Sequence, residues 1–174
     1  MRLPIIHQQD ATDCGPASLA MIAAYHKKRV SIARLRESAG TDRHGTNLAG
    51  LKIAAEQVGF QARAVRISAA VLPETSLPAI AHWREGSRNH FVVVYQVLAK
   101  CITIGDPASG LRKLGPEEFR RNWTGVLLLI SPTARLDDVV DSRWTLTWAT
   151  VLLRQHRSGP VYPFALAKAS LRGG

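Results

Sequence analysis

Cys14 stands at the point where a run of small and apolar residues begins, in the stretch HQQDATDCGPASLAMIAAYH (7–26). Asp13 is of a type that caps helices, and Gly15 and Pro16 suit a first helical turn, whose amide groups have no partner within the helix. A helix N-terminus lowers the pKa of a thiol, because unpaired amides and the helix dipole favour negative charge there. This placement predicts a reactive thiol, although free cysteine is also among the most buried residue types and often only packs.

A reactive thiol needs a base, and the chain has six histidines. His90 stands at the start of the apolar run HFVVVYQV, where a rigid strand would hold a polar ring near the surface. The other five flank the first predicted helix, lie in a loop or in the C-terminal segment, or fall inside a strand: His7, His26, His44, His82 and His156. We therefore predict that His90 is the base that activates Cys14.

Asp106 is the acidic residue that a hairpin would bring to His90. If residues 90–97 fold back on residues 101–105 through a turn near Leu98, the two side chains are symmetric about Leu98 and lie directly opposite each other. Opposite side chains have Cβ atoms roughly 4.5–5.5 Å apart, which lets a carboxylate orient an imidazole. A plainer interpretation also fits, because GDPASG is favourable turn chemistry with or without catalysis.

A tetrahedral intermediate formed on a thiol also needs hydrogen-bond donors for its oxyanion. Backbone amides at the start of the Cys14 helix supply one donor, and an amide side chain upstream would supply another. Gln8 and Gln9 both lie within reach in the sequence. The residues alone leave the choice between them open.

Three helices are predicted in the first third of the chain, and the first of them contains Cys14. Ser31 is the expected N-cap of a second helix that ends near residue 38, and Asn47 is the expected N-cap of a third that ends at Val58. These helices must hold the thiol, while the strands that follow must hold its base.

From Phe60 onward the pattern changes to short apolar runs separated by turn signals. Four or five strands are indicated by FQARAVRI, LPAIAHW, HFVVVYQV, CITIGDP and GVLLLISP. GPEEFRR (115–121) indicates one more short helix, with proline at its start and acidic residues in its first turn. Helices first and strands after favour an α+β domain with an antiparallel sheet.

The bulk composition narrows the classes of function. The 174 residues are 46% hydrophobic and fit one domain, and the two cysteines are too few for a disulfide framework or a four-ligand zinc site. Free thiols in a reducing cytosol are therefore favoured. No apolar run reaches the roughly 18–20 residues of a membrane helix. The net charge of +10 indicates an anionic partner, but no stacking-aromatic motif or zinc finger accompanies it, which disfavours nucleic acid.

Gln8, then DATDCGPASLAMI, LPAIAHW, NHFVVVYQV, ITIGDPASGLRKLGPEEFRRNWTG and VLLLISP follow one another in an order that is more specific than any single motif. Together these segments, over about residues 5–133, resemble the papain-like peptidase domain at the N-terminus of bacterial ABC exporters that cut double-glycine leaders from bacteriocins and related peptides. The resemblance implies a papain-like cysteine peptidase fold, α+β in class, with N-terminal helices packed on an antiparallel sheet over residues 1–135.

The resemblance also assigns roles. It implies Cys14 as the nucleophile, His90 as the base and Asp106 as the group that orients the imidazole. Gln8, six residues before the cysteine, is implied as the oxyanion donor, and Gln9 drops out by that spacing. No cofactor and no metal are implied.

In exporters of this kind a membrane domain and an ATPase follow the peptidase, and neither is recognisable in these 174 residues. We therefore expect a free-standing relative or a truncated gene product, with a double-glycine leader as substrate and an ABC exporter as partner. The implied location is cytoplasmic, at the inner face of the membrane through the exporter. Residues 136–174 form a basic tail to which we assign no element and no membrane helix.

Two other functions are compatible with the same residues. Some members of the wider family lack the cysteine and only bind an export substrate, but here all four implied active-site residues are present, which favours an active peptidase. A papain-like acyl- or amidotransferase would use the same cysteine, histidine and aspartate with an amine acceptor in place of water.

Overall fold

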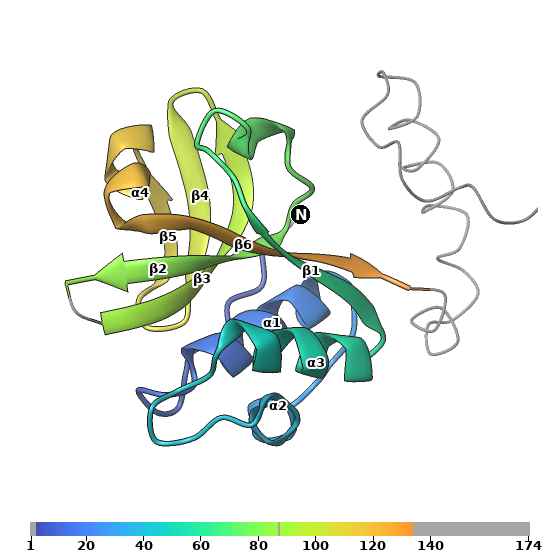
Figure 1. The fold of residues 1–174 in the computed structure, drawn as a ribbon. Coiled ribbons are helices and arrows are strands. Elements are labelled where there is room, and N and C mark those ends of the chain that lie inside the picture. The colour runs from blue at the N-terminus through green and yellow to red at the C-terminus, as the bar shows by residue number, and fades with distance from the viewer. Residues whose placement is uncertain (1–2, 87, 134–174) are drawn as a thin grey trace, which may run out of the picture. The chain divides into compact units, whose positions relative to one another are not determined.

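The computed structural model describes residues 3–86 and 88–133 of the chain. They form an α+β domain in which three helices precede a six-stranded antiparallel sheet (Figure 1). This confirms the predicted fold class. The predicted basic tail, residues 136–174, lies outside the described residues.

The three N-terminal helices are α1 (Cys14–Tyr25), α2 (Ile32–Ala39) and α3 (Leu48–Gln57). Two of them begin at the predicted caps. Ser31 Oγ accepts a hydrogen bond from the amide of Arg34 at 3.3 Å, and Asn47 Oδ1 accepts one from the amide of Gly50 at 2.8 Å. These bonds satisfy amide groups that have no partner within the helix.

Asp13 occupies the predicted N-cap position of α1, and its carbonyl accepts a hydrogen bond from the amide of Ala17 at 2.9 Å, but its side chain makes no capping bond. Its backbone φ of −90° and ψ of 1° lie outside the extended region that an N-cap residue adopts, and its side chain makes no bond to the first turn. The carboxylate is directed to other partners, which are described with the site.

The sheet is formed by β1 (Phe60–Arg66), β2 (Ala79–Glu85), β3 (Arg88–Leu98), β4 (Cys101–Asp106), β5 (Gly110–Leu114) and β6 (Trp123–Pro132), in the spatial order β1-β6-β2-β3-β4-β5. The prediction of four or five strands missed β5. This edge strand has five residues, of which only Gly110 and Leu114 are buried, so it lacks the apolar run that identifies a strand.

Two short helical elements complete the domain. The predicted helix in GPEEFRR is present as α4 (Pro116–Asn122), with Glu117 and Glu118 in its first turn. A single 3₁₀ turn, η1 (Leu72–Glu74), lies between β1 and β2. Within the described ranges, no helix is both long enough and apolar enough to cross a membrane.

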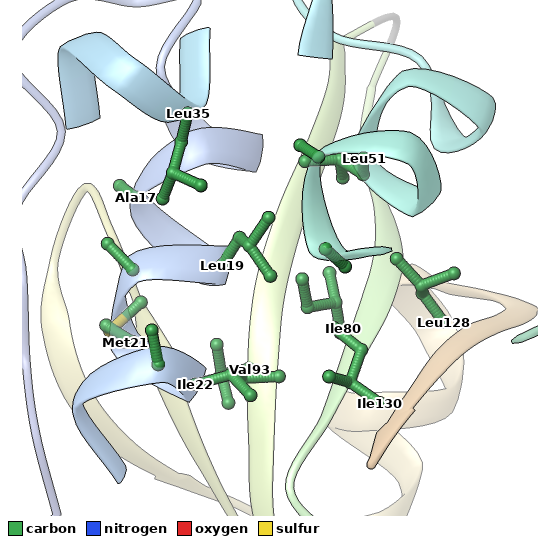
Figure 2. Packing of buried hydrophobic residues seen from close by; sticks show 14 of the residues in the cluster. Ala17, Leu19, Met21, Ile22, Leu35, Leu51, Ile80, Val93, Leu128 and Ile130 are labelled. Atoms are coloured by element: carbon green, nitrogen blue, oxygen red, sulfur yellow. The ribbon is translucent and has the colours of Figure 1, made fainter. Parts of the chain in front are cut away.

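α1 is the central helix of the core, and residues 14–23 are buried all round it. Figure 2 shows its side chains beside those of the sheet and of α2 and α3; the labelled residues are Ala17, Leu19, Met21 and Ile22 of α1, Leu35, Leu51, and Ile80, Val93, Leu128 and Ile130 of the sheet. Burial on every side fixes the helix in place. The start of α1, where Cys14 lies, is therefore set by the core.

α2 and α3 pack closely because Gly50 has no side chain. A Cβ atom at this position would lie 2.1 Å from the carbonyl oxygen of Ala39, the last residue of α2. Backbone atoms of the two helices could not then keep their present separation.

Candidate active site

His90 and Asp106 are in direct contact on neighbouring strands. His90 is the third residue of β3 and Asp106 is the last of β4. Nε2 of the imidazole lies 2.8 Å from Oδ1 of the carboxylate. The two residues that the hairpin was predicted to bring together do meet.

The register of that hairpin nevertheless differs from the prediction. Leu98 pairs with Cys101, so the turn is centred between Ala99 and Lys100 and not on Leu98. The register then shifts once within the ladder. The last pair joins Val93 to Gly105. The imidazole and the carboxylate therefore meet beyond the last pair of the ladder and are not directly opposite each other.

The carboxylate of Asp106 is held by several donors. Its Oδ1 also accepts a hydrogen bond from the amide of Ala108 at 2.8 Å, and its Oδ2 accepts one from Ser109 Oγ at 2.7 Å. Arg112 Nη1 lies 3.7 Å from Oδ2. Burial raises the pKa of this carboxyl, but the hydrogen bonds from His90, Ala108 and Ser109 outweigh burial and hold the pKa well below its usual range. Asp106 is a fixed anion.

The imidazole of His90 also reaches Cys14. Because Nε2 faces the carboxylate, Nδ1 is the ring nitrogen left for the thiol. Burial lowers the pKa of His90, but hydrogen bonds with Asp106 and Cys14, together with the charges of these groups, outweigh burial and raise it to about 9. The ring therefore links the sulfur to the carboxylate and is protonated near neutral pH.

Ser18 fixes the start of α1 against the strand that carries His90. It lies one helical turn after Cys14, on the same side of the helix. Its hydroxyl is completely buried and donates a hydrogen bond to the carbonyl of Phe91 at 3.2 Å. This bond joins the helix to the residue next to His90, and so sets the approach of the sulfur to the ring.

Gln8 is tied to the turn that follows Asp106. The backbone amide of Gln8 donates a hydrogen bond to the carbonyl of Pro107 at 3.0 Å, and His7 Nδ1 lies 3.3 Å from the same oxygen. Oε1 of Gln8 is buried, and the described part of the chain places no donor within hydrogen-bond distance of it. Gln9, the other candidate, is exposed.

The amide of Cys14 is a second group without a partner. It is the first residue of α1, and no acceptor for this amide is found among residues 3–86 and 88–133. An N-cap side chain normally bonds the amide of the second or third helical residue, so the amide of Cys14, the first residue of α1, is not one that Asp13 would cap. The backbone donor that the sequence predicted at the helix start is thus available.

The partner of Asp13 is the feature of the site that the sequence did not reveal. Its carboxylate is fully buried, and Oδ1 lies 2.6 Å from Nη1 of Arg36 on α2. Asp13 lies just before α1 and Arg36 lies on α2, and their separation in the sequence does not predict the contact.

The second cysteine, Cys101, is not one of the predicted active-site residues. Cys101 is the first residue of β4, is half-buried, and is free, as Cys14 is. In the part of the chain that the structure describes, no group of three or more His, Cys, Asp or Glu side chains is placed to hold a metal ion.

Comparison with known proteins identifies the family. The model of the Peptidase C39 family matches residues 2–135. The chain belongs to the peptidase C39 family. This C39 chain is 40% identical over 155 residues to the lactococcin-G-processing and transport ATP-binding protein LagD of Lactococcus lactis subsp. lactis, a match that covers 87% of this chain and 22% of that protein. It thus spans about a fifth of the length of this curated relative.

Solved structures of C39 peptidase domains have the same fold. The peptidase domain of Streptococcus ComA, a bi-functional ABC transporter involved in a quorum-sensing pathway, has a TM-score of 0.73 and 33% identity, covering 76% of this chain and all (100%) of that one. A double-glycine-motif protease from an AMS/PCAT transporter, in complex with the leader peptide, has a TM-score of 0.71 and 39% identity, covering 76% and 93%. These likenesses confirm the resemblance and the papain-like fold drawn from the sequence.

Proposed function

We propose that this C39 domain is a cysteine endopeptidase that cuts precursor peptides after a double glycine and acts with an ABC exporter at the cytoplasmic face of the membrane. The hydrogen bond of His90 with Asp106 at 2.8 Å, in a ring whose pKa Cys14 also raises, is the observation that carries the proposal. Two similar proteins support the substrate class: one is a lactococcin-G-processing and transport protein, and the other is a double-glycine-motif protease bound to a leader peptide.

The first half of the reaction forms an acyl-enzyme. The thiolate of Cys14 attacks the carbonyl carbon of the second glycine, and the electron pair of the C=O bond moves to oxygen. The imidazolium of His90 then gives its proton to the nitrogen of the scissile bond as that bond breaks. The mature peptide leaves with a free amino group, while the leader stays on the sulfur as a thioester.

The second half of the reaction returns the enzyme to its starting state. Water attacks the thioester carbonyl and gives a proton to the neutral imidazole of His90. The C–S bond breaks, which restores the thiolate beside the imidazolium, and the leader leaves as a carboxylic acid that loses its proton to solvent. Asp106 accepts a hydrogen bond from Nε2 throughout, which keeps Nδ1 aimed at the sulfur and stabilises the charged ring.

Two donors are available for the oxyanion that forms in each half. The backbone amide of Cys14 has no acceptor within the described residues. The side-chain amide of Gln8 belongs to a segment that is tied to the turn after Asp106. Donors of this kind, fixed before the charge develops, are commonly worth about a hundred- to a thousandfold in rate each.

The proposal is tested with the full chain and a peptide that carries a Gly-Gly site between a leader-like helix and a short cargo. Cys14→Ala should lower kcat by about 10⁴-fold or more, whereas Cys101→Ala should cleave as the wild type does. Mass spectrometry should find a single cut after the second glycine and a leader that ends in a carboxylate.

Each other outcome removes part of the proposal. Cleavage by Cys14→Ala would remove the cysteine mechanism. Transfer of the leader to an added amine in preference to water would identify a transferase. Tight binding of the peptide by a wild-type chain that does not cut it would leave only a docking role.

A further inference from the structure

The residue just before Cys14 is a buried carboxylate, which is an unusual neighbour for a group that must carry negative charge. Asp13 has a side-chain exposure of 0%, whereas Arg36 of α2, at 33%, reaches solvent with part of its side chain. Nη1 of Arg36 lies 2.6 Å from Asp13 Oδ1. A buried charge in this position requires a partner, and Arg36 is that partner.

The same carboxylate closes the turn that leads into the helix. Its Oδ2 accepts a hydrogen bond from the amide of Asp10 at 3.0 Å, while the amide of Asp13 donates to the carbonyl of Asp10 at 3.1 Å. Arg36 Nη1 also lies 3.1 Å from Oδ2 of Asp10. One guanidinium nitrogen therefore holds both ends of this turn to α2.

This arrangement keeps the Asp13 carboxylate away from the first turn of α1. Aspartate at this position of a helix ordinarily accepts hydrogen bonds from first-turn amides. Here both carboxylate oxygens are engaged elsewhere, and the amide of Cys14 has no acceptor among the residues that the structure describes. Without Arg36, the buried charge of Asp13 would stand uncompensated next to Cys14, where the thiolate and the oxyanion also carry negative charge.

We propose that Asp13 and Arg36 are positioning residues for the nucleophile: Arg36 neutralises the buried carboxylate and holds it in the turn before α1, so that its charge does not oppose the anions that form at Cys14. This inference rests on the proposed peptidase function. It assigns neither residue a contact with substrate.

The proposal predicts a specific kinetic effect of Arg36→Gln. A carboxylate that has lost Arg36 would repel the oxyanion, which carries its charge only in the transition state and intermediate, so kcat should fall by about tenfold or more. KM should stay within about twofold of the wild-type value. Arg34→Gln is the matched control, because Arg34 lies exposed on the same helix and its side chain enters none of the ion pairs found among the described residues.

Two further variants separate positioning from simple stability. Arg36→Lys keeps the cation and should restore most of kcat. Asp13→Asn combined with Arg36→Gln removes the uncompensated charge and should cleave faster than Arg36→Gln alone, a non-additivity that loss of folding does not produce. Thermal unfolding of every variant gives the folded fraction for which kcat is corrected.

A readout without cleavage distinguishes failure of this inference from failure of the proposed function. In a Cys101→Ser background, iodoacetamide labels only Cys14, and Arg36→Gln should slow the labelling by about fivefold or more, because the charge of Asp13 then acts uncompensated on the sulfur. Slowed labelling in a chain that cuts no Gly-Gly peptide would keep the positioning role and remove the peptidase. Labelling and corrected kcat that match those of Arg34→Gln would overturn the inference.

Discussion

The two halves of the site, one on the sheet and one at the start of α1, differ in how many of their polar atoms have hydrogen-bond partners. On the sheet, both oxygens of Asp106 accept hydrogen bonds, and the ring of His90 has a partner on each side. On the helix side, Gln8 Oε1 and the amide of Cys14 have no partner within the described ranges.

This contrast follows from what each half has to do. The sheet side carries charge before the substrate arrives, and its hydrogen bonds keep that charge fixed. In the proposed reaction the amide of Cys14 donates to an oxygen that becomes charged only during catalysis, and this donor has no acceptor among the described residues. Substitutions on the two sides should therefore fail in different ways.

The largest effect is expected on the sheet side, from Asp106→Asn. The geometry would be kept, but the ring would lose its anion, and kcat should fall by about 10³–10⁴-fold, as for comparable replacements in other triads. Because hydrogen bonding and charge from Asp106 raise the pKa of His90 to about 9, the alkaline limb of kcat/KM should also move to lower pH.

The pH profile of the Asp106 variant is measured between pH 5 and 10 beside that of Asp42→Asn, a change in an exposed loop that should alter neither limb. An unchanged alkaline limb in Asp106→Asn would show that another group sets it.

The next largest effect is expected on the helix side, from Gln8→Ala. Loss of one oxyanion donor should lower kcat by about a hundred- to a thousandfold, while both limbs of the pH profile stay in place, since no charge is removed. Gln9→Ala is the matched control, because this neighbour is exposed.

The same variant tests whether the helix side is built for function at some expense of stability. Gln8→Ala removes a buried oxygen that has no donor in the described part of the chain, so its free energy of unfolding should be equal to or above that of the wild type. A clear loss of stability would mean that the side chain has a structural partner in solution.

The smallest effect is expected in the pH dependence of stability. The pKa of His90 lies above its ordinary value of 6.5, at about 9, so the folded state binds the proton more tightly than the unfolded chain. This stabilisation is fully present below about pH 6.5 and is lost as the pH rises through about 9.

The measurement is denaturant unfolding of the wild type and His90→Gln. The free energy of unfolding of the variant should fall short by about 2–3 kcal/mol at pH 6, and the deficit should shrink by pH 9.5. His44→Gln, in an exposed loop, should show no such trend. A deficit of the same size at both pH values would contradict the assignment.

The features that the sequence predicted correctly depend on local chemistry. Ser31 and Asn47 mark helix starts because a hydroxyl or amide oxygen bonds an amide two or three residues later. The contact of His90 with Asp106 was predictable because a short turn leaves few ways to pair two apolar runs.

The features that it missed depend on packing between distant segments. The register of the β3–β4 hairpin shifts between Val94 and Gln96, and the residue types there do not predict the shift. Asp13 is of a residue type that caps helices, yet its carboxylate forms an ion pair with Arg36 because α2 packs beside the turn. The residue type of Asp13 favours a capping bond to the helix, but the tertiary contact with Arg36 replaces that bond here.

Gly50 shows that the proposed active site depends on the packing of α2 against α3. Any larger residue would drive its first side-chain carbon into the Ala39 carbonyl, and α2 would have to shift, carrying Arg36 with it. A single methyl group at Gly50 would then disturb Asp13, the acid beside Cys14. A substitution at Gly50 alone should therefore lower activity even though every proposed active-site residue is retained.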